Sequence, residues 1–445
     1  MALAATTAPC AALAAPAASP AAVGNRRSHM LRASRPAQFT AVSSACRRGH
    51  RLSRTASLRI ACSAAEGASA PAAAAAPATE APVATASSDA ELRFPPATST
   101  IMVTGPTSYI GRNVVKQLVA QGFNTVSYSR PRAGAGGKLS TADIEKDFEG
   151  AECVFGQATS MEQISEAIAS RPEGKKVDAM ICCLASRGGG VEDSWLVDYQ
   201  ATVNCLNACI ENDVKHFVLL SAICVQRPLL EFQRAKIVSE DLIRKAGAEG
   251  KITYSIVQPT AFFKSLAGQV ESVMGGGPYV MFGNGELTAC KPIGEIDLAN
   301  YCIECLNDPT KNNQTLPIGG PGPAYTPLAQ GQLLFKLLGK EENFVKAPVG
   351  LMDAVIGGLD FLKKYFPGAF TDPAEFGRIG RYYATESMLL LDPETDEYTA
   401  DGTPEYGTLT LEQFFKDSIE NGLSNQELGD ASFLSWGKAK EVEKN

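Results

Sequence analysis

The chain has 445 residues, of which 45% are apolar and 20% are charged, and this balance is ordinary for a soluble globular protein. Its 41 basic and 48 acidic side chains give a formal net charge of −7, which argues against a protein built to bind nucleic acid. No charge-free apolar stretch reaches the length of a membrane-spanning helix, so we do not expect an integral membrane protein.

The first 62 residues have a composition of their own, with nine Arg, no Lys and no acid before Glu66. Subtracting these nine from the 41 basic side chains leaves 32 against 48 acids, a net charge of −16 for residues 63–445. A leader rich in Ala, Ser and Arg and free of acid is typical of organelle transit peptides, and a small-residue site at 60–64 follows it. We predict a transit peptide over 1–62; the alternative is a disordered basic arm for nucleic acid.

A linker is predicted over 63–96, where Ala, Pro, Ser and Thr predominate and too little apolar surface is available to order the chain. From about Ser99 short apolar runs alternate with segments of helical periodicity. The expected strands cover 100–104, 125–129, 177–184, 216–221 and 252–258, and the expected helices cover 109–121, 161–170, 195–212 and 231–246. This alternation predicts right-handed crossovers and a parallel sheet, an α/β Rossmann-like doubly wound fold over 97–260.

After Pro259 the pattern changes, and we expect a smaller C-terminal substrate lobe over 261–445 that also returns elements to the sheet. Residues 262–292 are rich in Gly and large apolar groups. The expected elements beyond them are helices at 296–306, 327–338 and 351–365 and a strand at 314–318. Apolar positions in 351–365 recur at helical spacing, which predicts an amphipathic helix ending in Lys363 and Lys364.

The first strand and helix enclose a glycine turn at 103–112, Val-Thr-Gly-Pro-Thr-Ser-Tyr-Ile-Gly-Arg. Gly105 permits a tight turn, Gly111 permits close packing of helix on strand, and the helix N-terminus can bind a pyrophosphate. Ser108 replaces the middle glycine of a GxxGxxG pattern. The position after the first strand nevertheless predicts dinucleotide binding, with a degenerate structural turn as the alternative.

The end of the second strand carries Arg130, with Arg132 nearby, where an NAD site would place an acid for the ribose 2′-hydroxyl. A guanidinium can bind a 2′-phosphate through paired hydrogen bonds. The sequence therefore favours NADP(H) over NAD(H), unless both arginines are merely solvated.

Two later strand ends, at Leu184–Ser186 and Ser221–Ala222, point to the same crevice. Ten residues further on, Phe232 and Lys236 have the spacing of the YxxxK pattern of short-chain dehydrogenases. Lys236 can bind the nicotinamide ribose, unless it is a solvated helix residue. Phe232 has no proton to donate, which argues against ordinary alcohol–ketone chemistry.

The cysteines predict buried thiols in a reducing compartment rather than a metal or redox centre. Three of the twelve lie in the leader, and the pair Cys302 and Cys305 has no second pair to complete four ligands. Two of the three His also lie in the leader, and His216 alone cannot supply a His-based metal site or a Ser-His-Asp triad. We expect no metal.

The chain from about 99 to 436 resembles the atypical short-chain dehydrogenases related to isoflavone reductase and NmrA. More closely, it is similar to the NADPH-dependent divinyl chlorophyllide a 8-vinyl-reductases of plants and algae. The segments that carry the resemblance are 103–122, 127–134, 216–236, 254–270 and 318–339. The resemblance implies NADPH-dependent reduction of the C8 vinyl group of divinyl chlorophyllide a, or of divinyl protochlorophyllide, to ethyl. It also implies a chloroplast location, in the stroma or at the surface of a thylakoid or envelope membrane.

The resemblance also implies roles for individual residues. The pyrophosphate loop would comprise Gly105, Thr107, Ser108, Tyr109, Ile110 and Gly111. Arg130 would bind the 2′-phosphate, and Ser221, Lys236, Pro259 and Thr260 would flank the nicotinamide, with Lys236 as the catalytic candidate. A floor for the tetrapyrrole would include Phe262, Phe263, Tyr279 and Met281, although the same residues fit the core of the lobe. The proton donor is left open among Tyr279, Tyr109 and solvent. Helix 351–365 either touches a membrane or packs on its own domain.

Three other functions remain open at this point. One is an isoflavone-reductase-like or sugar-nucleotide enzyme that acts on another small substrate. The second is a protein without turnover, either an NmrA-like sensor of NADP(H) or a fold-related chloroplast RNA-binding protein, although the −16 charge opposes RNA. The third, an iron–sulfur vinyl reductase, would need clustered Cys ligands.

Overall fold

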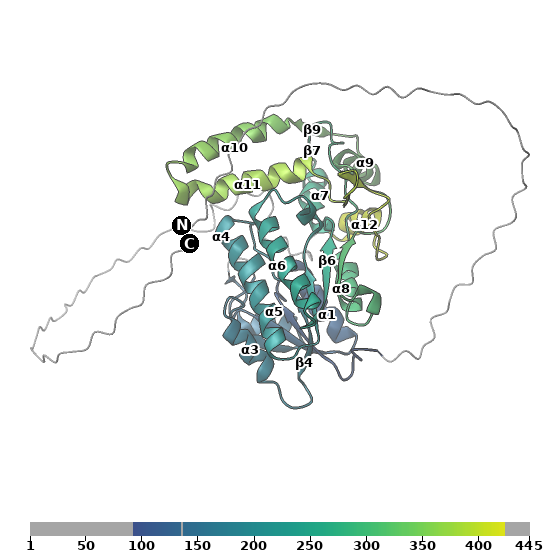
Figure 1. Cartoon of the computed structure of the whole chain (residues 1–445). Coiled ribbons are helices and arrows are strands. Elements are labelled where there is room, and N and C mark those ends of the chain that lie inside the picture. The colour runs from purple at the N-terminus through teal and green to yellow at the C-terminus, as the bar shows by residue number, and fades with distance from the viewer. Residues whose placement is uncertain (1–91, 135–136, 423–445) are drawn as a thin grey trace, which may run out of the picture. The chain divides into compact units, whose positions relative to one another are not determined.

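The computed structural model describes residues 92–134 and 137–422, and these belong to one compact unit (Figure 1). The predicted transit peptide and most of the predicted linker lie outside the described residues.

A seven-stranded sheet, parallel throughout, has the strand order β3-β2-β1-β4-β5-β6-β8. Its strands are β1 (Thr100–Thr104), β2 (Asn124–Ser129), β3 (Glu152–Phe155), β4 (Val177–Cys182), β5 (His216–Leu220), β6 (Thr253–Pro259) and β8 (Gln314–Ile318). The Rossmann-like doubly wound prediction is confirmed, with every strand that the sequence indicated. The additional edge strand β3 was missed because it is short and only half-buried.

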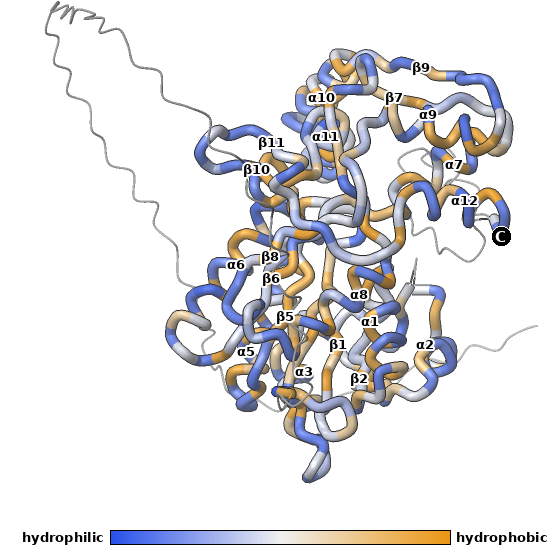
Figure 2. Tube along the Cα trace, turned by 90° about the vertical axis from the view of Figure 1, so that its right-hand side faces the viewer, coloured by the Kyte–Doolittle hydropathy of each residue, from blue (hydrophilic) through white to orange (hydrophobic). Residues whose placement is uncertain are grey.

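Helices cover both faces of the sheet (Figure 2). One face packs against α1 (Tyr109–Ala120), α2 (Thr141–Asp147) and α8 (Glu295–Glu304), the other against α3 (Met161–Ala169), α5 (Thr202–Glu211) and α6 (Glu231–Ala248). Each face has its own cluster of buried apolar side chains, so the sheet lies between two hydrophobic layers. The element α8 lies beyond residue 260 in the sequence but packs beside α1.

The single regular helix predicted at 195–212 is wrong. The chain instead forms a short turn α4 (Val191–Asp193), a π-helical segment η2 (Ser194–Ala201) and then α5. In η2 the Thr202 hydroxyl donates to the Val197 carbonyl five residues back, at 3.2 Å. Within this segment Asp198 is buried, whereas Val197 is half-exposed. π-helical turns inside helices often mark functional sites.

The C-terminal lobe has a third hydrophobic cluster. It is built from α7 (Ala267–Met274), β7 (Tyr279–Phe282), α9 (Pro327–Leu338), β9 (Phe344–Ala347), α12 (Leu411–Asn421) and the 3₁₀ turn η4 (Phe263–Leu266). Phe263 stacks on Phe414 in its centre, with ring centroids 4.8 Å apart. A small hairpin of β10 (Leu390–Asp392) and β11 (Glu397–Thr399) follows the last long helix of the lobe.

Two helices lie side by side at the top of Figure 1, α10 (Val349–Lys363) and α11 (Pro367–Thr385). The sequence predicted α10, but α11 was missed because Pro and Gly residues interrupt it. Asp360 and Asp353 of α10 form ion pairs with Arg378 and Arg381 of α11. No helix in the described part of the chain is long and apolar enough to cross a bilayer.

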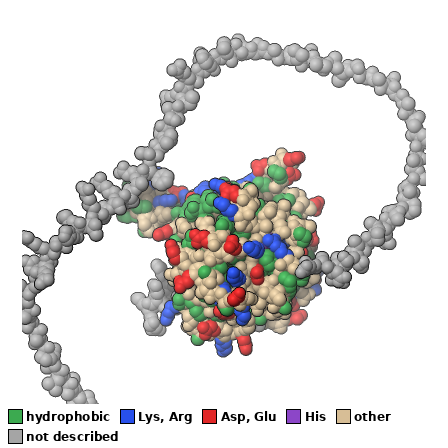
Figure 3. Space-filling model, turned by 60° about the horizontal axis from the view of Figure 1, so that its bottom comes forward, with side chains coloured by type: hydrophobic (Ala, Val, Ile, Leu, Met, Phe, Trp, Pro, Cys, Tyr) green, Lys and Arg blue, Asp and Glu red, His purple; other side chains and the backbone are tan. Residues whose placement is uncertain are grey.

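Ile356 of α10 is buried against Gly377 of α11, but most of the large apolar side chains of α10 and of the turn after it face away from α11. Leu351 is 60% exposed and Tyr365 is 65% exposed, and the other exposed members are Val355, Phe361, Leu362 and Phe366. At 100° per residue these positions fall on one side of the helix. Elsewhere, on the face that Figure 3 shows, Lys and Arg side chains are interspersed with Asp and Glu.

The fold begins before the predicted boundary at residue 97. Phe94 is buried, its N–H donates to Asn307 Oδ1 at 2.7 Å, and its carbonyl accepts from Asn307 Nδ2 at 3.0 Å. Arg93 donates to the Thr253 hydroxyl at 2.7 Å. Residues 92–96 therefore belong to the sheet domain rather than to the linker.

We expect Phe94→Ala to lower the free energy of unfolding by about 3 kcal/mol, because it empties a buried aromatic site. Chemical denaturation with fluorescence detection measures the change. Leu92→Ala, at an exposed position two residues earlier, should stay within about 0.5 kcal/mol of the wild type. An equal effect of the two substitutions would mean that Phe94 does not anchor the fold.

Candidate cofactor and active site

The carboxyl ends of the parallel strands form the edge at which the predicted site residues gather. Gly105 follows β1, Arg130 follows β2, Ser221 follows β5, and Pro259 ends β6. The strand order reverses between β1 and β4, and open α/β sheets bind ligands at such a reversal. The four strand ends that the sequence assigned to one crevice thus lie along one edge.

The glycine turn touches the end of β4 so closely that side chains are excluded. Gly105 has a φ of 75°, and a Cβ there would lie 2.7 Å from the Cys183 carbonyl oxygen. A Cβ on Gly111 would lie 2.2 Å from the Gly105 carbonyl oxygen. Both distances are far shorter than van der Waals contact, so both positions require glycine.

Ser108 takes a structural role in place of the missing middle glycine. Its hydroxyl caps α1 by accepting from the Gly111 N–H at 3.1 Å, and it donates to the Cys183 carbonyl at 3.2 Å. The N–H groups of the first helical turn have no acceptor within the helix. With Gly111 already capped, the N–H groups of Tyr109 and Ile110 are the ones that α1 can offer to a pyrophosphate.

The hydroxyls of the two tyrosines considered as proton donors both donate to side chains of the protein. Tyr109 bonds to Glu295 Oε2 at 2.9 Å, and burial together with this carboxylate raises its pKa. Tyr279 bonds to Gln330 Oε1 at 3.0 Å, and burial raises its pKa too. The Tyr109 ring also packs against Phe262 and lies beneath the Lys264 ammonium. Neither hydroxyl is placed to give up a proton easily.

At the adenosine end, Arg130 is exposed beyond the last residue of β2, and no acid occupies this strand end. No described residue forms an ion pair with its guanidinium. Arg187, from the loop after β4, reaches across to donate to the Gly134 carbonyl in the loop after β2. The helix N-terminus, the glycine turn and the uncommitted guanidinium together fit a dinucleotide that carries a 2′-phosphate.

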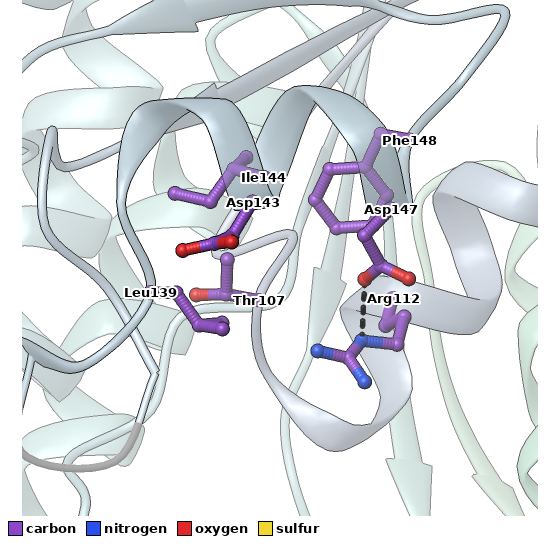
Figure 4. Close-up of a pocket in the computed structure, with 7 residues that line it drawn as sticks. All are labelled: Thr107, Arg112, Leu139, Asp143, Ile144, Asp147 and Phe148. Carbon is purple, nitrogen blue, oxygen red and sulfur yellow. Dashed lines mark ion pairs between the residues drawn. The ribbon is translucent and has the colours of Figure 1, made fainter.

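A cavity of about 200 Å³ lies beside the glycine turn, between α1 and α2 (Figure 4). Thr107 and Arg112 line one side of it. Asp143 and Asp147 line the other, and Arg112 pairs with Asp147 at 2.9 Å. The cavity carries two carboxylates and one guanidinium, and this guanidinium is already paired. The charge balance disfavours a phosphate there, so the start of α1 is the better candidate for the pyrophosphate.

Ser221 belongs to a buried network that the sequence analysis missed. Its hydroxyl donates to Glu240 at 2.5 Å, and Gln258 donates to the same carboxylate at 3.0 and 3.1 Å. Arg244, one turn further along α6, also bonds to Glu240 at 2.5 Å. The Ser221 hydrogen is therefore committed to Glu240, while the oxygen can still accept a hydrogen bond.

Lys236 is buried, and its ammonium nitrogen lies 2.9 Å from Asp198 Oδ1, with side-chain exposures of 9% and 0%. Burial acts to lower the pKa of Lys236, but the Asp198 carboxylate outweighs this effect and raises it above the ordinary value. The expected alternative of a solvated lysine is therefore wrong. Asp198 escaped the sequence analysis because an acid was not expected at a buried position, although its spacing from the buried Thr202 and Cys205 could have indicated it.

Helix α11 packs on the start of α6, one turn before Lys236. Ile379 and Tyr382 pack in one cluster with Phe232, the residue at the position of the dehydrogenase tyrosine. Asp372 accepts from the Val191 N–H at 3.0 Å, and Glu375 accepts from the Glu231 N–H at 2.8 Å. Two carboxylates of α11 thus accept hydrogen bonds from the first N–H groups of α4 and α6. Helix α4 leads into the segment that carries Asp198, and α6 carries Lys236.

The end of β6 is fixed by hydrogen bonds to neighbouring backbone. The Thr260 N–H donates to the Ile318 carbonyl at 2.9 Å, and its hydroxyl donates to the Lys291 carbonyl. This places the Pro259–Thr260 turn at the carboxyl edge between β6 and β8. Its neighbour Phe262 is half-buried against Tyr109.

The other three residues predicted for a tetrapyrrole floor lie inside the lobe. Phe263, Tyr279 and Met281 are each no more than 2% exposed. Phe263 and Tyr279 pack in the third hydrophobic cluster, and Met281 lies between them and the Gly285 turn. Their packing fits the alternative of lobe core, and only Phe262 keeps a partly exposed ring near the glycine turn.

The predicted burial of the thiols is confirmed for seven of the nine described cysteines, all of which are free. Cys302 lies on α8 and Cys305 directly after it, Cys205 and Cys209 lie on α5, and all four face the hydrophobic core.

Comparison with known proteins supports the geometry. A sequence model described as NAD(P)H-binding matches residues 105–309. The chain is 54% identical over 341 residues to the chloroplastic divinyl chlorophyllide a 8-vinyl-reductase of Zea mays, covering 76% of this chain and 84% of the maize protein. It is 52% identical over 342 residues to the reductase of the same name from Arabidopsis thaliana, covering 76% and 81%. Among solved structures, the leucoanthocyanidin reductase–NADPH complex from Vitis vinifera matches with a TM-score of 0.52 at 15% identity, covering 72% of this chain and 99% of that one.

We expect Arg130→Ala to weaken NADPH binding about tenfold to a hundredfold, because it removes a charged hydrogen bond to the 2′-phosphate worth about 1.5–3 kcal/mol. The dissociation constant for NADH should change little. Titrations that follow the cofactor fluorescence measure both. Lys251→Ala, an exposed cation in the turn before β6, serves as the control and should leave both constants unchanged. Equal losses for NADPH and NADH would contradict the assignment of Arg130.

Proposed function

The chain belongs to the family of the chloroplastic divinyl chlorophyllide a 8-vinyl-reductases, and we propose that it reduces the C8 vinyl group of divinyl chlorophyllide a, or of divinyl protochlorophyllide, to ethyl with NADPH. The observation that carries the proposal is the 54% identity to the maize reductase across 84% of that protein. The dinucleotide site at the carboxyl edge of the sheet supports it.

The chain's own residues would hold the cofactor at both ends. The Gly105 turn and the N–H groups of Tyr109 and Ile110 would bind the pyrophosphate, and Arg130 the 2′-phosphate. At the other end, Lys236 would bind the nicotinamide ribose, while Ser221 and the Pro259–Thr260 turn flank the ring. When bound, NADPH supplies the hydride for the reduction.

The vinyl group of the substrate is conjugated to the macrocycle, so the negative charge that follows hydride addition can spread into the ring system. A proton must then be added to carbon to complete the ethyl group. Because this chemistry creates no alkoxide, it does not require the tyrosine that protonates the alkoxide in ordinary alcohol dehydrogenases. The packing of Phe232 beneath Ile379 and Tyr382 of α11 agrees with this. In this role the apolar cluster of Phe232, Ile379 and Tyr382 would exclude water and orient the macrocycle. Phe262 would contact the macrocycle near the cofactor.

The substrate assay decides between turnover and mere cofactor binding. We expect the recombinant chain to convert divinyl chlorophyllide a in the presence of NADPH, with a blue shift of the Soret band and a mass gain of two hydrogens. Activity with NADH should be much lower because Arg130 would lack its phosphate partner. Tight NADPH binding without reduction of any pigment would contradict the proposal and favour a sensor of NADP(H).

We further propose that the protein acts in the chloroplast stroma and touches a membrane through the outer face of α10. That face gathers Leu351, Val355, Phe361 and Tyr365, and Lys363 and Lys364 adjoin it. The acids of α10 lie on the opposite side in ion pairs with α11, so they do not oppose an anionic surface. Exposed apolar groups next to cations are the pattern of helices that bind in the plane of a bilayer.

We expect the wild-type chain to co-sediment with vesicles that contain anionic lipid and to bind neutral vesicles less. The double variant Leu351→Ser and Phe361→Ser should lose most of this binding while its thermal unfolding midpoint changes little, because both side chains face solvent. Leu287→Ser, at a similarly exposed apolar position in the lobe, is the control. Unchanged binding of the double variant would exclude this face as the contact, and a concentration-dependent dimer lost in the same variant would point to a second copy instead.

A further inference from the structure

We propose that Asp198 is a positioning residue for the cofactor reaction, which holds the Lys236 ammonium charged and fixed at the nicotinamide end of the crevice. The inference rests on the proposed function for its link to catalysis. The ion pair itself is a feature of the structure and can be tested by NADPH binding alone.

Asp198 joins three elements around Lys236. Its Oδ1 lies 2.9 Å from the Lys236 nitrogen, and its Oδ2 accepts from the Ser186 N–H at 3.2 Å in the loop after β4. Its backbone carbonyl accepts from the Ser239 hydroxyl on α6 at 2.8 Å. One residue therefore links the end of β4, the segment η2 and the helix that carries Lys236.

The π-helical segment keeps Asp198 on the buried side of the chain. Asp198 and Thr202, four residues later, are both buried, so the acid lies on the same side as the start of α5. The start of the segment is held by the Ser194 hydroxyl, which donates to the Gly190 carbonyl at 2.6 Å, and by the Asp372 contact to Val191. π-turns persist where the neighbouring structure supports them, often at functional sites.

A buried charge is strongly disfavoured unless it is paired, and removing one partner leaves the other uncompensated. Four titratable groups interact with Lys236: Asp198 from η2, Cys182 at the end of β4, Cys183 directly after it, and Cys224 from the 3₁₀ turn η3 (Ile223–Gln226). Burial raises the pKa of Cys224 to about 11, so this thiol stays neutral near pH 7. A hydrogen bond with Cys205 lowers the pKa of Cys182, which makes Cys182 the group that an experiment must separate from Asp198.

The pairing leaves Lys236 able to bind a ligand. An ammonium has three N–H donors, and Asp198 engages one of them. Two nearby hydroxyl donors are committed, because Ser221 donates to Glu240 and Tyr382 donates to the Cys224 carbonyl at 3.0 Å. Lys236 keeps N–H groups that can donate to ribose hydroxyls, and Asp198 sets its charge and its position.

The test is the pH dependence of NADPH binding and of kcat/KM in the variant Asp198→Asn. Asparagine keeps the size of the side chain but removes its charge, so burial alone acts on Lys236 and lowers its pKa. Lys236 should then lose its proton at lower pH, and the alkaline limb of both profiles should move down by at least about one pH unit. On the alkaline side this equals about a tenfold loss of NADPH affinity. Asp198→Glu should keep the limb near its wild-type position.

Three further variants identify the titrating group. Lys236→Ala should lower turnover and NADPH affinity and abolish the shift caused by Asp198→Asn. Cys182→Ser should leave the limb in place, and Asp241→Asn, which removes an exposed carboxylate from the same helix, should do the same. A shift caused by Cys182→Ser, or an Asp198→Asn profile that keeps its wild-type limb while the unfolding midpoint falls, would overturn the proposal.

The outcomes also separate this proposal from the function. A shifted NADPH-binding profile with no reduction of any pigment would sustain the role of Asp198 and reject the vinyl reductase. Pigment reduction together with an unshifted NADPH-binding profile in Asp198→Asn would sustain the vinyl reductase and reject the role of Asp198.

Discussion

The close contact between the Gly105 turn and the carboxyl end of β4 is the constraint on which the rest of the site depends. A turn that lacks a side chain can approach the Cys183 carbonyl, and Ser108 then locks the start of α1 to the same carbonyl. The first turn of α1 thereby comes to lie at the point where the strand order reverses. The other candidate residues lie at the ends of strands that pair in register with the sheet around β1 and β4. This contact therefore sets their distances from the cofactor site.

Helix α11 couples the lobe to this edge through electrostatics as well as apolar contact. Asp372 and Glu375 occupy the N-termini of α4 and α6, where the helix dipole and unpaired N–H groups favour an anion. Both helices lead into the buried pair of Asp198 and Lys236. The lobe that would cover the substrate is therefore attached to the segments that would hold the nicotinamide, and the two parts cannot move independently without breaking these caps.

Local sequence patterns predicted much of the sheet domain because its elements obey local rules. Apolar runs of strand length gave β1, β2, β4, β5, β6 and β8, and the glycine spacing with its flanking strand and helix located the dinucleotide turn. Such rules did not predict the buried polar residues at the nicotinamide end of the site. Asp198 is an acid on the buried side of its helix, a position that apolar residues usually occupy, and Glu240 meets Ser221 through packing between distant segments.

The lobe shows a related limit. A run of Gly and aromatic residues fits a ligand floor and a hydrophobic core equally well, and the choice depends on which rings find partners. Phe263 stacks on Phe414, more than a hundred residues away in the sequence, and the Tyr279 hydroxyl donates to Gln330. Helix α11 was missed since Pro367, Gly368 and Pro373 disfavour a helix locally, while its contacts with α10 and the sheet domain stabilise one.

The polarity of α10 is reversed relative to an ordinary surface helix, with its acids turned toward α11 and its large apolar groups turned toward solvent. Ionic strength should then act in opposite senses on the two sides of one helix. Screening weakens the partly exposed pairs of Asp353 and Asp360 with their arginines, whereas strongly hydrated salts favour burial of the outer face. Helix α10 is thus held to α11 by these pairs most firmly in dilute solution, and its outer surface associates with other apolar surfaces most readily in concentrated salt.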